Sequence, residues 1–144
     1  HLRKIADALG RHIGIVSEMT DVRNRELAEV TKADDFVVSN KLISLMLSQV
    51  SENKKLTQVF DDLFSSVGSE VYLQPVEQYV APGTAVNFYT VLEAARRRGE
   101  TALGYRVAAN AHKSDKGFGV TVNPVKTETV TFSAGDKIIV LAEG

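Results

Sequence analysis

The hydrophobic pattern of the chain changes at residues 65–68, a short linker of small residues. Before it, all-apolar runs at 13–16 and 36–38 alternate with segments of helical periodicity, which is typical of a parallel sheet covered on both faces. After it, apolar and polar residues alternate in short runs, which favours antiparallel strands. We therefore expect an α/β region followed by a small, mostly antiparallel α+β region.

Residues 1–38 predict the order helix, strand, helix, strand, with the helices over 2–9 and 21–30. Residues 39–65 predict two successive helices. The first is apolar on more than one side, so we expect it to be buried on more than one side. The second, over 56–64, carries apolar residues at i, i+3, i+4, i+7 and i+8 and is strongly amphipathic.

The apolar face of the second helix has two plausible roles. It can belong to the core of the chain, or it can be a contact between subunits, where aromatic side chains concentrate binding energy. The five residues of this face are Leu56, Val59, Phe60, Leu63 and Phe64.

Residues 66–144 predict several short strands, one helix over 88–95 that ends before Gly99, and a tight turn at 133–136. The strands are expected around 70–73, 103–107, 118–122, 130–132 and 138–141.

Composition limits the classes of function. The chain has 144 residues, 44% of them apolar and 24% charged, which is the globular average and enough for one domain or two small lobes. A net charge of −1 argues against nucleic-acid binding and against polybasic membrane attraction. The absence of cysteine excludes disulfides, thiol catalysis and Cys-ligated zinc and favours a cytosolic compartment. No apolar run approaches the ~20 residues that span a bilayer.

No residue set predicts catalysis or a cofactor. His1, His12 and His112 lack metal-ligand spacing, and no G-x-S-x-G nucleophile elbow is present. Gly117-Phe118-Gly119 is a lone G-x-G, which we interpret as a bent loop that leads into a strand. The chain is therefore not predicted to be an enzyme.

Charged clusters offer two candidate ligand sites. Arg96-Arg97-Arg98 falls in the last turn of a helix, where cations favour the negative dipole end; an acidic partner or anionic ligand is the alternative. Asp61, Asp62 and Glu70 can supply oxygen ligands for calcium if the fold brings them together, as can Asp34-Asp35. Otherwise Asp61 and Asp62 form the wet side of the 56–64 helix, and Asp34-Asp35 ends a loop.

Several stretches, taken in order, resemble the CASTOR/POLLUX family of ion channels. The last of them is also similar to the final hairpin of TrkA C-terminal-like (RCK) lobes. These stretches are Val22–Ala28, Asp34–Ser39, Leu42–Leu47, Phe60–Phe64, Gly68–Leu73 and Ala134–Leu141.

The resemblance implies a Rossmann-like N-terminal lobe, crossover helices that join paired domains, and a small C-terminal lobe. On that basis 1–38 is the second half of the Rossmann-like lobe, 39–65 the crossover and dimerisation helices, and 66–144 the RCK C-terminal lobe. The glycine-rich turn of such a lobe is missing, so nucleotide binding is not carried over.

The function implied is that of a gating-ring regulatory domain of a potassium or calcium channel. We expect a soluble segment on the cytoplasmic side of a membrane protein, a homo-oligomer joined to pore helices, with calcium as the candidate ligand. One rival is a regulatory subunit of a TrkA-type potassium transporter. A second is the C-terminal half of a nucleotide-dependent oxidoreductase.

Overall fold

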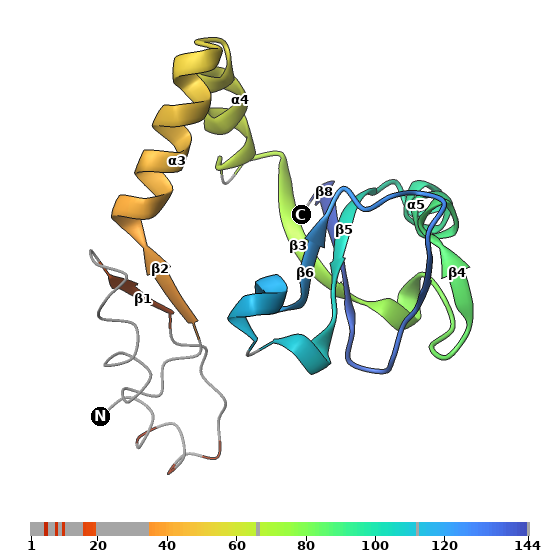
Figure 1. The fold of residues 1–144 in the computed structure, drawn as a ribbon. Helices are drawn as coiled ribbons and strands as arrows, with labels where there is room; N and C mark the ends of the chain where they lie inside the picture. Colours follow the sequence, from red (N-terminus) through yellow and green to blue (C-terminus); the bar gives the residue numbers. More distant parts are fainter. Residues whose placement is uncertain are drawn as a thin grey trace. The chain divides into compact units, whose positions relative to one another are not determined.

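The computed structural model (Figure 1) divides the chain into two units, His1–Val59 and Phe60–Gly144, and each is described separately. The predicted helix over 21–30 lies outside the described residues, as do most of the helix over 2–9, Asp34 and the three histidines. The residues that the structure describes are Ile5, Ala8, Gly10, 16–19, 35–65, 67–111 and 113–143.

The first unit contains a parallel strand pair. β1 (Val16–Met19) pairs with β2 (Asp35–Val38), and Val16 lies opposite Asp35. The parallel arrangement and the position of β2 agree with the sequence prediction. Of the strand predicted over 13–16, Val16 belongs to β1, and residues 13–15 lie outside the described residues.

Two helices follow β2. α3 (Ser39–Glu52) begins at the predicted residue, and a turn at Asn53–Lys55 separates it from α4 (Leu56–Leu63). In this turn the Asn53 side-chain oxygen accepts a hydrogen bond from the Lys55 N–H at 3.1 Å. The prediction that α3 is buried on more than one side is wrong, because none of its side chains is buried.

The second unit is an α+β arrangement built on a four-stranded antiparallel sheet (Figure 1). The last strand of the chain lies inside this sheet, between the first strand of the unit and a middle one. In spatial order the strands are β3 (Ser69–Pro75), β8 (Lys137–Glu143), β5 (Thr101–Arg106) and β6 (Val120–Val122).

A smaller antiparallel sheet and a helix complete the unit. β4 (Ala85–Asn87) pairs with β7 (Thr129–Thr131), and α5 (Phe88–Arg97) follows β4 directly. Asn87 caps α5, because its side-chain oxygen accepts a hydrogen bond from the Thr90 N–H at 3.2 Å. Three short 3₁₀ segments connect the strands: η2 (Val76–Gln78), η3 (Ala108–Asn110) and η4 (Ser114–Gly119).

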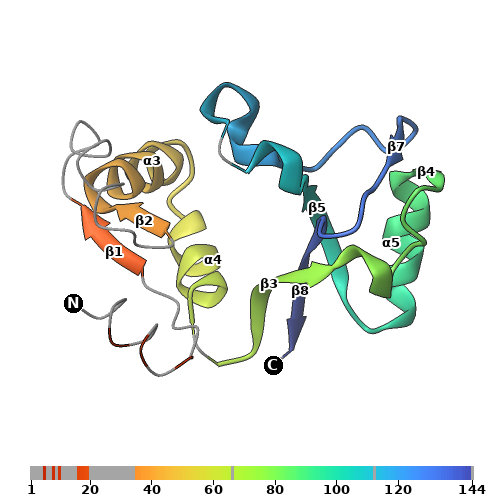
Figure 2. The same ribbon diagram turned by 90° about the horizontal axis from the view of Figure 1, so that it is seen from below.

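The core of the second unit lies where α5 and η2 pack on one face of the four-stranded sheet (Figure 2). An aromatic chain crosses it: Tyr105 lies edge-on to Phe132 at 5.3 Å between ring centroids and 6.2 Å from Phe88. The largest fully buried side chains are those of Phe132, Ile138, Val76, Val91 and Val140.

A buried carboxylate joins three segments of this unit. Asp136 is 3% exposed and accepts hydrogen bonds from the Ala108 and Ser133 N–H groups, both at 2.8 Å. Its backbone oxygen accepts a third bond from the Val76 N–H at 3.1 Å. The turn at 133–136 is therefore fixed to η2 and η3 by backbone partners.

Two strand predictions in this region need correction. The strand predicted over 118–122 begins at Val120, because Phe118 has φ 55° between two glycines of positive φ and cannot continue an extended strand. The ending that resembles a final hairpin is not one: β7 pairs with β4, whereas β8 pairs with β3 and β5. Gly117-Phe118-Gly119 is, as predicted, a bent segment leading into a strand.

Candidate functional site

Helix α4 presents the predicted apolar face. Val59 and Phe64, the latter just past the helix end, are 55% and 63% exposed, whereas Leu56, Phe60 and Leu63 are half-buried. The Phe60 and Phe64 rings stack with centroids 6.3 Å apart. No side chain of α4 is buried. The spacing thus gathers these side chains on one face, of which Val59 and Phe64 are exposed.

Helix α3 carries further exposed apolar side chains. Leu42, Ile43, Leu45 and Leu47 are 43%, 53%, 57% and 64% exposed. Single exposed apolar residues are ordinary, but several of them on two successive helices make these helices a candidate interaction surface. Helices with no buried side chain have little of the tertiary packing from which most helical stability comes. We therefore treat α3 and α4 as the first candidate site.

The predicted metal ligands do not form a cluster. Asp61 and Asp62 are exposed, and Glu70 accepts a hydrogen bond from the Tyr72 hydroxyl at 3.0 Å. This bond raises the pKa of Tyr72, because it stabilises the protonated phenol. Within the described ranges, no three His, Asp or Glu side chains are grouped so that they can hold a metal ion. Calcium binding therefore stays a prediction.

Arg96 and Arg97 lie in the last turn of α5, as expected, and share one acidic partner. The Arg96 Nε is 2.7 Å from one Glu93 carboxylate oxygen, and the Arg97 Nε is 2.9 Å from the other. Hydrogen bonds from these guanidinium groups lower the pKa of Glu93 to about 2. All of these side chains are largely exposed, so their mutual attraction adds little stability.

Arg98 belongs to a second cluster, which ties the end of α5 to η2. It donates to Glu100 at 3.1 Å and to Gln78 at 2.8 Å, and its guanidinium lies 5.2 Å from the centre of the Tyr79 ring. The Tyr79 hydroxyl donates to Glu100, and burial raises the pKa of Tyr79 to about 12. The arginine triplet is therefore engaged within its own unit, which favours the helix-end role over an anionic ligand.

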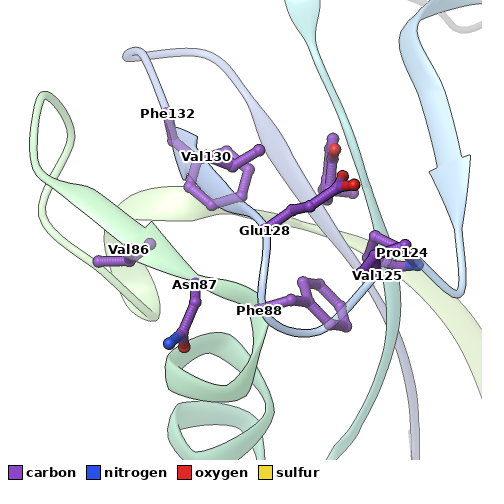
Figure 3. Close-up of a pocket in the computed structure, with 9 residues that line it drawn as sticks. Val86, Asn87, Phe88, Pro124, Val125, Glu128, Val130 and Phe132 are labelled. Atoms are coloured by element: carbon purple, nitrogen blue, oxygen red, sulfur yellow. The ribbon is translucent and has the colours of Figure 1, made fainter.

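Sequence reasoning missed a small hollow beside the aromatic chain (Figure 3). Its cavity volume is about 20 Å³, enough for about one water molecule and far below a drug-sized pocket. Figure 3 shows the Phe88, Phe132 and Glu128 side chains gathered around it. The Lys126 ammonium lies 5.3 Å from the centre of the Phe88 ring and donates to Asn123 at 2.6 Å. This hollow is too small to be a ligand site.

The known proteins to which the chain is similar are ion channels. The chain is 32% identical over 142 residues to the probable ion channel POLLUX of Arabidopsis thaliana, which covers 98% of the chain and 16% of that protein. It is 33% identical over 144 residues to the ion channel POLLUX of Lotus japonicus, covering 99% of the chain and 15% of that protein. The ion channel CASTOR of the same plant is 33% identical over 129 residues, covering 90% of the chain and 14% of that protein.

The chain is therefore a relative of the CASTOR and POLLUX ion channels over almost its whole length, and the resemblance expected from its sequence is confirmed. It spans about one sixth of the length of these relatives or slightly less. No protein-family model matches the chain. None of the helices in the described part of the chain is long and apolar enough to cross a membrane.

Proposed function

We propose that this chain is a regulatory segment of a cation channel, placed on the cytoplasmic side and acting through a change in subunit assembly. The observation that carries the proposal is the combination of channel similarity with two helices that have no buried side chain and that expose several large apolar ones. A gating segment needs such a surface, because it must transmit a change in arrangement from one subunit to another.

The order of elements supports the expected RCK organisation. A parallel β1/β2 pair precedes two apolar helices, and an antiparallel α+β unit follows. This order is compatible with the proposed Rossmann-like lobe, crossover helices and C-terminal lobe. The relatives are named ion channels, which favours the channel role over the transporter subunit and over the oxidoreductase.

The mechanism follows from linkage. A ligand shifts an equilibrium between two arrangements only if it binds one of them more tightly. Coupling of about 1–3 kcal/mol per site is typical, and equivalent sites in an oligomer add their effects. The α4 face supplies the contact that would differ between arrangements, because its Val59 and Phe64 side chains are exposed.

Calcium is the proposed ligand of the sensing step. Asp61, Asp62 and Glu70 would have to converge on binding, with Glu70 releasing the Tyr72 hydroxyl. Isothermal calorimetry of the chain with calcium, and with magnesium as the control, tests this part alone. A saturable heat with calcium only, abolished by Asp61→Ala with Asp62→Ala, is expected. No heat at millimolar calcium would contradict calcium sensing while leaving the assembly role intact.

The channel role is tested by a chimera with a related channel. The matching segment of the Lotus japonicus POLLUX channel is replaced by this chain, and ion flux is measured in vesicles that carry the purified chimera. We expect retained flux that Phe64→Asp alters, whereas Gln58→Asp, on the polar side of α4, leaves it unchanged. A chimera that assembles but responds equally to both substitutions would contradict a role for this face in gating.

A further inference from the structure

β3 is an edge strand whose outer side is unpaired. In the four-stranded sheet it neighbours β8 alone, and among the described residues no other strand pairs with it. It is seven residues long, with Glu70 as its only charged residue and Pro75 at its last position. Long edge strands that lack lysines and bulges are templates for pairing with another strand.

The register with β8 shows which backbone groups of β3 point outward. The Val76 N–H donates to the Asp136 oxygen, and these two residues continue the β3–β8 register. In an antiparallel ladder such hydrogen-bonded pairs alternate with non-hydrogen-bonded ones. Gln74 and Tyr72 therefore direct their N–H and C=O groups to β8, whereas Leu73 and Val71 direct theirs away from the sheet.

The side chains of the two outward-bonding residues are also exposed. Val71 is 49% and Leu73 is 51% exposed, on the sheet face opposite the core. Across the ladder they are paired with Leu141 and Ile139 of β8, so apolar rows on this face run out to the edge and stop there. A strand added at this edge would extend both rows.

We infer that β3 pairs antiparallel with β3 of a second copy of this chain, about a two-fold axis at Tyr72. This register overlaps all seven residues of the strand. It sets Val71 opposite Leu73 of the second copy, so that their outward N–H and C=O groups bond, and it sets Tyr72 opposite Tyr72 as a non-hydrogen-bonded pair. Aromatic pairs directly opposite one another stabilise such ladders.

The occupant is a second copy because the strand is complementary to itself. Glu70 falls opposite Gln74 of the second copy, whose amide can donate to the carboxylate, so no like charges meet. The apolar row that ends at Leu73 continues into the row that begins at Val71 of the second copy. Pro75 has no N–H to donate, but it falls at the end of the ladder, where one missing hydrogen bond matters least.

Single cysteines test the register, because the chain contains none of its own. In a non-hydrogen-bonded pair the two Cα atoms are ~4.5 Å apart, within disulfide reach, so Tyr72→Cys should give a disulfide-linked dimer on mild oxidation. Val71→Cys is the matched control: its Cα atoms would be about 8–9 Å apart, beyond that reach. No dimer with Tyr72→Cys, or a faster one with Val71→Cys, would overturn the proposal.

Charged substitutions at Val71 and Leu73 test the β3–β3 contact without changing a core residue. The background is Phe64→Asp, so that the α4 face does not contribute and a failure of the proposed function stays distinguishable. Val71→Lys with Leu73→Lys sets like charges opposite each other and should weaken dimerisation at least about tenfold. Val71→Glu with Leu73→Lys sets opposite charges together and should restore it, less so at high salt. Equal dimerisation of the two variants by analytical ultracentrifugation would overturn the pairing.

Discussion

Helices α3 and α4 contain no buried side chain, whereas the strands and helix of residues 69–143 enclose five large side chains with less than 2% exposure. Both regions are rich in leucine, valine and phenylalanine. In the second region, segments far apart in the sequence, such as η2, α5 and β8, cover one another. In the first, exposed residues such as Leu47 and Phe64 have no comparable cover.

This difference indicates two sources of stability. Residues 69–143 carry a core of their own, so mutations there should change unfolding of this unit at any protein concentration. Short helices without tertiary packing are marginal in water, so α3 and α4 should gain order from a contact outside the described elements. The comparison predicts core effects in one region and assembly effects in the other.

The largest expected effect tests the core. Phe132 is 1% exposed and packs edge-on against Tyr105, so Phe132→Ala should lower the free energy of unfolding by about 3–5 kcal/mol. Leu47→Ala in α3, which removes a 64% exposed side chain, should change it by no more than about 0.5 kcal/mol. Urea unfolding followed by circular dichroism measures both. Equal losses of unfolding free energy would contradict the claim that the two regions differ in their packing.

A smaller effect is expected at the buried carboxylate. Asp136→Ala removes the acceptor of the Ala108 and Ser133 N–H groups and should cost about 2–3 kcal/mol, because hydrogen bonds to charged groups are the stronger ones. Asp115→Ala, at an exposed position of η4, is the control and should change the free energy of unfolding very little. If Asp136→Ala leaves the free energy of unfolding unchanged in the same urea experiment, the turn does not need this contact.

The smallest effect concerns the exposed ion pairs of α5. The pKa of Glu93 is lowered from 4.5 to about 2 by Arg96 and Arg97, so its contribution is present above pH 4.5 and is lost as the pH falls towards 2. Glu93→Gln should therefore make the urea midpoint slightly less sensitive to acid over that window. Gln58→Ala, which changes an exposed side chain that does not ionise, should keep the wild-type pH profile. Identical pH profiles for the two variants would show that the contacts of Glu93 with Arg96 and Arg97 do not stabilise the fold.

Local signals in the sequence predicted α3, α4 and α5. α3 and α4 fall within the segment 39–65 that predicts two helices, and Gly99 follows α5, because helix breakers act within a few residues. Strand pairing is different, since it joins distant segments. No local sequence signal in β8 indicates that it lies between β3 and β5, and none in β7 indicates that it pairs with β4.

The candidate site, too, could be predicted only where local sequence determines it. Periodicity alone was enough to gather Val59, Phe60 and Leu63 on one face of α4, and the structure agrees. The partners of Arg98 required the fold, because Gln78 is twenty residues away. The open edge of β3 could not be predicted either, since an edge is defined by which strand is missing beside it and not by the residues of the strand itself.

The α4 face as a subunit contact is the central claim, and sedimentation equilibrium tests it most directly. The background is Val71→Lys with Leu73→Lys, so that the β3 edge does not contribute. We expect self-association at micromolar concentration that Phe64→Asp weakens at least about tenfold and that Gln58→Asp leaves unchanged. A chain that is monomeric before Phe64 is changed, or equal association of the two variants, would contradict the account.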